Sequence, residues 1–216
     1  MKKEFKIQIS KERYFDGGYD HLKRFISYFY QINLVRKLKP EKALEIGIGN
    51  KTVANYLKQQ GVSIETCDFD EELGPDYVAD IRELPFQDNS YDLVLACEIL
   101  EHLPWEDVDK ALREIRRVTK KYAIISIPYA MNCFELIVSS PLIEKWRKGP
   151  FRFLLKLPVA PKDIKFTGEH YWEMGRKSYP YQKVRGKFEE YFRVVKEVSP
   201  MLDAYRHIFV LEKKDI

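Results

Sequence analysis

The sequence predicts an α/β protein whose strands lie mainly parallel in one sheet. Three observations support this prediction: short apolar runs alternate with segments of helical periodicity, two glycines follow the first run, and acidic residues follow later ones. Parallel strands must be joined by crossovers, so helices are expected to cover both faces of the sheet. The carboxyl ends of such strands meet at one edge, where the glycines and acids would form a binding site.

Three helices and five strands are expected before Pro128, after an irregular segment at 1–18. The helix at 19–38 ends before Pro40, and a second helix at 51–60 ends at Gly61. The first helix has one apolar stripe that we expect to be buried: Leu22, Phe25, Ile26, Phe29 and Ile32. The third, at 105–118, has a stripe of Val108, Ala111, Leu112, Ile115 and Val118. Buried strands are expected at 43–46, 62–67, 77–79, 91–97 and 122–127.

The pattern changes after Pro128. A helix is expected at 131–147, and a segment rich in proline, lysine and aromatic residues follows to about 181. A helix at 181–191 then precedes two strands, at 192–198 and 205–211. We interpret 139–180 as an inserted lid, because it is too short and too poor in periodic apolar residues to bury its own core. The chain is therefore expected to be one domain, 1–216, made of an N-terminal segment and helix (1–38), a binding core (40–128), the lid (139–180) and a last helix and strand pair (181–216).

Composition indicates a cytoplasmic protein. The N-terminal sequence MKKEFKIQIS has no apolar core of a secretory signal, and no run approaches the ~18 apolar residues of a membrane-spanning helix. The three cysteines, Cys67, Cys97 and Cys133, are far apart and form no CxxC pair. Free thiols in a reducing compartment are therefore expected rather than a disulfide framework or a structural zinc site.

Positive charge is concentrated in one segment. The net charge is +4, but residues 145–187 alone contain twelve Lys or Arg against three acids, so the remainder is acidic. This basic segment also has large apolar residues, among them Trp146, Phe151 and Phe153. It is compatible with peripheral contact to an anionic membrane, with nucleic acid, with an acidic acceptor, or with a solvated lid.

The most informative feature is an ordered series of motifs. ALEIGIGN at 43–50 contains Glu45, Gly47 and Gly49, and a later strand ends at Asp68. Asp80 then precedes LPF at 84–86, and YDLVLACEILEHL occupies 91–103. Over roughly 40–128 the series resembles the class I S-adenosylmethionine-dependent methyltransferases, in particular the small-molecule enzymes of quinone and sterol biosynthesis. The resemblance implies a Rossmann-like three-layer sandwich, with a seven-stranded, mostly parallel sheet and an antiparallel last strand. We expect an α-rich lid after strand 5.

The resemblance also implies S-adenosyl-L-methionine as the cofactor, with S-adenosyl-L-homocysteine as its product. Gly47 and Gly49 let the first strand-helix turn approach the ligand closely, and amides at the helix start would face its carboxylate. Asp68 would bind the ribose hydroxyls, and Asp80 with Ile81 would contact the adenine edge. The full set of implied cofactor residues is Glu45, Gly47, Ile48, Gly49, Asn50, Asp68, Phe69, Asp80, Ile81 and Cys97. Lys51 stands where the family usually has a third glycine. A nicotinamide-binding motif would need glycine at position 52, which is Thr52.

Catalytic residues are harder to predict, because methyl transfer mainly requires a methyl group and a nucleophile held at attack distance. Glu98, Glu101 and His102 would share one face of a helical turn. His102 is a candidate base. The three residues are also a candidate divalent-cation site, similar to that of certain quinone O-methyltransferases and small-RNA 2′-O-methyltransferases. A structural turn whose histidine binds backbone is the remaining interpretation.

GEHYWEMG at 168–175 is the second dense cluster. Its aromatic residues and His170, another catalytic candidate, are typical of a lid that closes over an acceptor, or of a surface loop anchored by Trp172. We therefore expect methyl transfer to a small-molecule acceptor, at oxygen. The alternatives are an RNA methyltransferase with a divalent-cation site and a non-catalytic S-adenosylmethionine-binding protein. The sequence leaves the acceptor, the pathway and the oligomeric state open.

Overall fold

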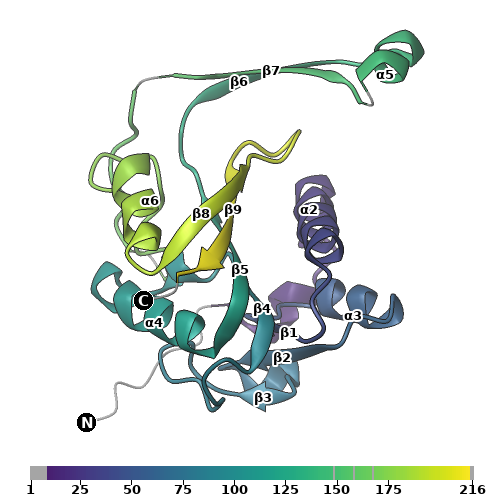
Figure 1. Ribbon diagram of the computed structural model, residues 1–216. Coiled ribbons are helices and arrows are strands. Elements are labelled where there is room, and N and C mark those ends of the chain that lie inside the picture. Colours follow the sequence, from purple (N-terminus) through teal and green to yellow (C-terminus); the bar gives the residue numbers. More distant parts are fainter. Residues whose placement is uncertain (1–8, 148, 158, 167, 215–216) are drawn as a thin grey trace.

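The computed structural model describes residues 9–147, 149–157, 159–166 and 168–214. Its centre is a seven-stranded sheet with the order β3-β2-β1-β4-β5-β9-β8 (Figure 1). Strands β1 to β5 are parallel, and β9 runs antiparallel to both β5 and β8. This confirms the predicted fold class, including its antiparallel last strand. The strands are β1 Ala43–Ile46, β2 Ile64–Asp68, β3 Tyr77–Val78, β4 Tyr91–Cys97, β5 Thr119–Pro128, β8 Phe192–Val198 and β9 Arg206–Lys213.

Helices cover both faces of the sheet. Leu34 of α2 (Leu22–Leu38) and Leu57 of α3 (Thr52–Gln59) pack with Leu93 and Ile124 on one face. On the other face, α4 (Val108–Val118) and α6 (Tyr181–Glu189) pack against alternate residues of the same strands. Both faces are buried because successive side chains of a strand point to opposite sides. In the described ranges, no helix is both long enough and apolar enough to span a membrane.

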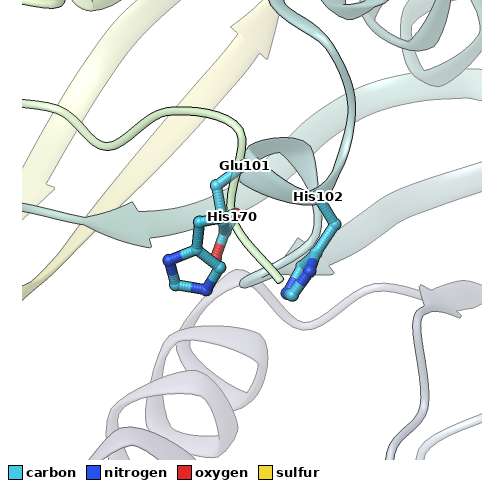
Figure 2. Close-up of side chains that lie close together, drawn as sticks. All are labelled: Glu101, His102 and His170. Atoms are coloured by element: carbon cyan, nitrogen blue, oxygen red, sulfur yellow. The ribbon is translucent and has the colours of Figure 1, made fainter. Parts of the chain in front are cut away.

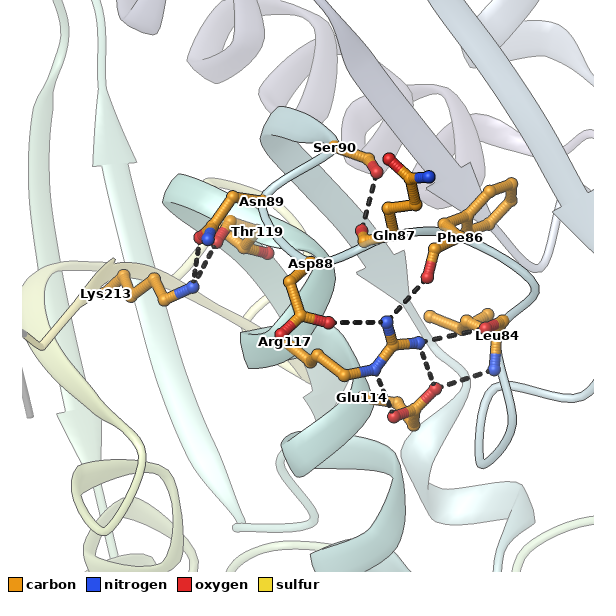
Figure 3. A network of polar contacts seen from close by, with 10 residues as sticks. All are labelled: Leu84, Phe86, Gln87, Asp88, Asn89, Ser90, Glu114, Arg117, Thr119 and Lys213. Atoms are coloured by element: carbon orange, nitrogen blue, oxygen red, sulfur yellow. Dashed lines mark hydrogen bonds and ion pairs between the residues drawn. The ribbon is translucent and has the colours of Figure 1, made fainter.

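The predicted apolar stripe of 105–118 is confirmed, although its first turn is not α-helical. Residues Trp105–Asp107 form the 3₁₀ helix η3, and α4 then begins at Val108. All five stripe residues of α4 are fully buried. Arg117, near the end of this helix, donates to the carbonyls of Leu84 and Phe86 at 2.9 and 2.6 Å (Figure 3). Glu114 accepts the Leu84 amide, so α4 holds the segment that follows Asp80 in place.

The buried face of α2 differs from the predicted stripe. Leu22, Phe25 and Phe29 are exposed by 53–70%, whereas Ser27, Gln31, Leu34 and Val35 are buried. Ser27, Gln31 and Val35 lie four residues apart and therefore share one face of the helix. Burial of Val35 at one end of this face also buries the polar residues Gln31 and Ser27. Gln31 donates to the Ser27 hydroxyl at 3.0 Å, which satisfies the buried polar groups.

The prediction of an irregular segment at 1–18 is wrong for part of its length. Residues Lys11–Phe15 form the short helix α1, while positions 1–8 lie outside the described residues. Tyr14 of this helix packs edge-on against Tyr19, with ring centroids 5.2 Å apart. The segment thereby reaches the glycine turn, since a Cβ added to Gly49 would lie 3.4 Å from the Tyr14 ring.

The insertion contains a β-ribbon, so the predicted α-rich lid is wrong. The helix predicted at 131–147 is confirmed only for its last part, 141–147. Strands β6 (Cys133–Val138) and β7 (Phe151–Lys156) pair antiparallel, and the short helix α5 (Pro141–Arg147) lies between them in the chain (Figure 1). Their apolar residues alternate with a period of two, which is a strand pattern. The extra structure therefore begins at Cys133, ahead of the predicted start at 139.

The ribbon is attached to the domain through its polar face. Arg152 donates to the carbonyls of Ser199 and Pro200 at 2.5 and 3.0 Å, and Glu135 accepts the amide of Leu202 at 3.0 Å. The other face has the cross-strand pairs Phe134–Leu155, Leu136–Phe153 and Val138–Phe151, all exposed by 39–67%. The ribbon thus projects from the turn between β8 and β9 and contributes little to the core.

Candidate active site

The turn after β1 has the backbone conformation that glycine favours. Gly47 and Gly49 have φ values of +75° and +48°, and a Cβ at Gly47 would collide with the side chain of Ile99. Lys51, at the position of the family's third glycine, itself adopts a left-handed conformation with φ +62°. Its ammonium donates to the Gly74 carbonyl at 2.5 Å, so this lysine fastens the turn to the segment after β2.

Asp68 connects this turn to the end of β2. One carboxylate oxygen accepts the Ile48 amide at 2.9 Å, and the other accepts the Asp70 amide at 3.0 Å. The residue is 6% exposed, and burial raises the pKa of its carboxyl. Asp68 therefore orients two backbone segments while it lines the cavity described below.

Asp80 is held by a neighbouring arginine. The Arg82 guanidinium donates to both oxygens of Asp80, at 2.8 and 2.5 Å, and to Asp107 at 2.9 Å. The side chain of Arg82 is only 8% exposed, so the two carboxylates compensate its charge. This ion-pair network links the segment after β3 to the start of α4. It places Asp80 and the buried Ile81 beside Asp68 in the cavity wall.

A cavity of about 1230 Å³ joins most of the predicted site residues. The predicted residues in its lining are Gly47, Gly49, Asp68, Phe69, Asp80, Ile81, Cys97, His102 and His170. A smaller cavity of about 50 Å³ is lined by Glu45, Ile48 and Asn50, and it shares Gly47, Gly49 and Cys97 with the larger one. The carboxyl ends of β1, β2 and β4 and the lid therefore meet at one place.

Glu45 is a buried acid at the end of β1, in the wall of the smaller cavity. It is 6% exposed, and its Oε2 has no hydrogen-bond partner in the described ranges. Burial raises the pKa of Glu45 to about 8. The carboxyl is thus protonated at neutral pH unless a cation lies next to it.

Protein without added ligand is expected to lose stability relative to Glu45→Gln as the pH rises from 5 to 7. The pKa of Glu45 in the folded state lies above the unfolded value of 4.5, so the native state keeps this carboxyl protonated when the unfolded state has lost the proton. The stability that this proton contributes is lost as the pH rises toward 8. We expect a relative loss of about 1 kcal/mol per pH unit, below the limit of about 1.4. Urea unfolding of both proteins at each pH measures it. If the free energies of unfolding of the two proteins changed with pH in parallel, the raised pKa of Glu45 would be contradicted.

Glu101, His102 and His170 come together where the lid meets the sheet edge (Figure 2). Glu101 and His102 belong to the 3₁₀ helix η2 (Leu100–His102), and His170 comes from the lid. One ligand atom from each of the three lies within 4.8 Å of the others. Glu98 lies outside this cluster: it has a positive φ of 58°, accepts a hydrogen bond from Ser126 at 2.8 Å and pairs with Arg206 at 3.4 Å.

Charges around this cluster are strongly affected by burial. Burial, aided by His170, lowers the pKa of His102 to about 4, so its imidazole is neutral at pH 7. Burial also raises the pKa of Glu101 well above its usual range, and it raises the pKa of the Cys97 thiol. For Glu173, burial acts upward, but hydrogen bonds from His170, Tyr205 and Arg176 outweigh it and lower the pKa to about 2.

Trp172 anchors the segment that contains His170. Its side chain is fully buried, and the indole donates to the Leu103 carbonyl at 3.1 Å. The neighbouring Tyr171 amide donates to the Glu101 carbonyl at 2.8 Å. The predicted anchor of the GEHYWEMG loop by Trp172 is therefore confirmed. Glu169, His170 and Tyr171 line the cavity, and closure of this loop over an acceptor stays a prediction.

Trp172→Phe is expected to lower the free energy of unfolding by about 2 kcal/mol, since it removes buried ring atoms and leaves the Leu103 carbonyl without its donor. Chemical denaturation followed by circular dichroism measures the change. The matched control is Trp146→Phe in α5, where the side chain is 91% exposed and no change is expected. Equal effects of the two substitutions would contradict the anchoring role.

Several lining residues were missed by the sequence interpretation. Arg24 lines both cavities, its guanidinium stacks 4.3 Å from the Tyr19 ring centroid, and its Nε has no hydrogen-bond partner within the described chain. Tyr14 and Arg206 also line the larger cavity. A basic residue in an amphipathic helix has no local signal of function, so Arg24 could be found only from the fold.

The strand order and the antiparallel last strand are those of the class I methyltransferase fold. Residues 44–127 match the methyltransferase domain family, which confirms the resemblance to the class I S-adenosylmethionine-dependent methyltransferases. This match covers the strands and turns that contain Glu45, Asp68, Asp80 and Cys97.

Individual relatives are partial in length or distant in sequence. An uncharacterised protein of Methanocaldococcus jannaschii is 52% identical over 90 residues, which cover 42% of this chain and 35% of that protein. The demethylmenaquinone methyltransferase of Thermotoga maritima is 28% identical over 122 residues, 48% of this chain and 52% of that enzyme. The chain therefore spans between about a third and a half of these curated relatives.

The same fold is found in a solved structure of another methyltransferase. The 1,6-didemethyltoxoflavin-N1-methyltransferase of Burkholderia thailandensis superposes with a TM-score of 0.63 at 14% identity. The match covers 94% of this chain and 85% of that enzyme. At this identity the similarity establishes the fold alone.

Proposed function

We propose that this protein transfers the methyl group of S-adenosylmethionine to an oxygen atom of a small-molecule acceptor. The observation that carries the proposal is that the strand-end acids, the glycine turn and the lid histidine line one cavity. Its volume of about 1230 Å³ exceeds the roughly 300–1,000 Å³ of the pockets that bind drug-sized ligands. The cavity therefore has room for a cofactor and an acceptor side by side.

The residues around the glycine turn fit the cofactor's amino acid end. Arg24 Nε and Glu45 Oε2 are buried polar atoms that lack hydrogen-bond partners among the described residues. Both border the small cavity beside Gly47 and Gly49. A guanidinium and a carboxyl group together suit a ligand that has both a carboxylate and an ammonium group, because each buried polar atom then gains a partner. Asp68, Phe69 and Asp80 would contact the nucleoside.

The lid side of the cavity would hold the acceptor. S-adenosylmethionine supplies a methyl group on a sulfonium, which is an activated leaving group. The chain's own task is then to position the nucleophile and to exclude water. Phe166 and Tyr171 stack with ring centroids 3.9 Å apart and form an aromatic wall, and His102 and His170 lie next to it. His102 donates its Nδ1 proton to the Glu169 carbonyl at 3.1 Å, so its Nε2 has the lone pair that can accept the acceptor's proton.

Two relatives support a small-molecule acceptor. The demethylmenaquinone and 1,6-didemethyltoxoflavin enzymes are named for small organic molecules. The choice of oxygen is supported by the two histidines beside the acceptor side of the cavity, because a hydroxyl nucleophile benefits from a base.

Calorimetric titration with S-adenosylhomocysteine tests cofactor binding. Incubation with methyl-labelled S-adenosylmethionine and a panel of hydroxylated, amine and carboxylate small molecules then tests transfer. We expect one bound nucleoside per chain and labelled O-methyl product. The absence of nucleoside binding would overturn the proposal, and labelling of an amine would replace oxygen as the accepting atom. RNA labelled in a metal- and salt-dependent manner would favour the RNA methyltransferase instead, while binding without transfer would favour a non-catalytic protein.

A further inference from the structure

Glu101 poses a physical problem that the proposed function does not solve. Its side chain is fully buried, and neither carboxyl oxygen has a hydrogen-bond partner in the part of the chain that the structure describes. Burying an unpaired polar group is unfavourable, and burying an unpaired charge is considerably more so. A buried carboxyl group without a partner therefore indicates a ligand that the site is built to receive.

The two neighbouring histidines are oriented as metal-binding histidines are. His102 Nδ1 lies 3.1 Å from the Glu169 carbonyl, which can only accept a hydrogen bond. His170 Nδ1 lies 3.0 Å from Glu173 Oε1, and Glu173 is itself held by Arg176 and Tyr205. Both rings thus have the proton on Nδ1 and the lone pair on Nε2. A metal-ligating histidine almost always donates its other ring N–H to a carbonyl or carboxylate in this way.

The geometry points to a binding site for one divalent transition-metal ion, held by Glu101, His102 and His170. The three ligand atoms lie within 4.8 Å of one another (Figure 2). Ligand atoms at about 2.0–2.2 Å from a zinc ion lie roughly 3–4 Å from one another. Side-chain rotations that move each ligand atom by less than about 1 Å would therefore complete the site. Glu101 would then gain the partner that it lacks.

The ligand set selects the class of ion. Two imidazoles and one carboxylate suit zinc, manganese, iron or cobalt, whereas magnesium and calcium prefer sites made of oxygen ligands. Three protein ligands also leave at least one coordination position open, as in catalytic rather than structural zinc sites. His102 and His170 line the large cavity, so this position would face the acceptor side.

The role of the ion rests on the proposed function. A bound divalent ion polarises a coordinated hydroxyl group and fixes its position. Without an ion, a histidine would have to accept the proton of the hydroxyl group unaided. The substrate class narrows accordingly to acceptors that have a metal-binding oxygen, such as an enol, a phenol or a vicinal diol. Binding of the ion itself does not depend on the methyltransferase activity.

Metal binding is tested on the full chain after removal of ions with a chelator. Equilibrium dialysis against Zn²⁺ with elemental analysis gives the stoichiometry, and the visible spectrum of the Co²⁺ form reports nitrogen and oxygen ligation. We expect one ion per chain. Glu101→Gln and His170→Ala are each expected to weaken binding by at least about 100-fold, since even outer contacts of metal ligands contribute 10–100-fold.

Matched control variants and a titration with S-adenosylhomocysteine distinguish failure of the metal site from failure of the proposed function. His21 and Glu106 are exposed and lie outside the cluster, so His21→Ala and Glu106→Gln should bind the ion as the unmodified chain does. If S-adenosylhomocysteine binds but the chain takes up no ion, or if the ligand variants bind it normally, the metal site is overturned and the proposed function stands. If the ion binds but the nucleoside does not, the metal site stands and the proposed function fails.

Discussion

Asp68→Ala is expected to weaken binding of S-adenosylhomocysteine by at least about 100-fold. The carboxylate accepts the amides of Ile48 and Asp70, and it faces the cavity where the ribose hydroxyls would lie. Each hydrogen bond to a charged group contributes about 1.5–3 kcal/mol, and the glycine turn also loses its connection to β2. Isothermal titration calorimetry of the variant and the unmodified chain measures the difference.

Two further variants make this expectation specific. Asp68→Asn keeps the shape of the side chain and one acceptor oxygen, so an intermediate loss of affinity is expected. The melting temperature should also fall, because the new NH2 group meets one of the two backbone amides that Asp68 accepts. Glu83→Ala removes an exposed acid three residues after Asp80 and should leave affinity unchanged. Normal affinity of a folded Asp68→Ala chain would show that the nucleoside does not lie against β2.

Gly175→Ala is expected to lower the free energy of unfolding by about 3 kcal/mol. The residue has φ +88°, and a Cβ there would lie 2.7 Å from two ring carbons of Tyr129 and 2.9 Å from Met131 Cγ. Tyr129 is buried, so its ring has little room to move away. Strain of the left-handed backbone and overpacking each contribute about 1–3 kcal/mol. The melting temperature should fall by roughly 6–12 °C.

The control for this substitution is a glycine in an open environment. Gly186 lies within α6, and a Cβ there would meet no atom within 4 Å of the described structure. Gly186→Ala should therefore stabilise the chain by about 0.5–1 kcal/mol, because alanine has the higher helix propensity. Differential scanning calorimetry distinguishes the two signs. A stabilising effect at both positions would show that the lid does not pack against Tyr129 as described.

The strand-end residues were predictable because their signals are local. A buried apolar run followed by glycine marks a strand that enters a turn, and acids after successive runs come to the same sheet edge whenever the strands are parallel. Asp68 and Asp80 line one cavity for this reason. The five buried residues of α4 were equally predictable, because helix periodicity alone selects its inner face.

The errors fall where the local pattern had two readings. The segment at 131–147 could be read as a helix, whereas β6 forms because β7, more than ten residues later, supplies its hydrogen-bonding partner. In α2 the predicted apolar stripe is largely exposed, and the helix instead buries the row that contains Ser27 and Gln31. Which face a helix buries depends on its neighbours, and the hydrogen bond between these two side chains makes the polar contact tolerable.

The succession of strands along the chain, the glycine turn and the acids at the strand ends were determined by the sequence alone, because each depends on residues close together in the chain. The tertiary structure decided which distant side chains share the site. It brought Arg24 to the glycine turn, turned Glu98 toward Ser126 and Arg206, and placed His170 beside Glu101. These contacts depend on how the N-terminal segment and the lid pack on the sheet edge, through Tyr14 and the buried Trp172. Such packing is a property of the whole fold, and no local pattern encodes it.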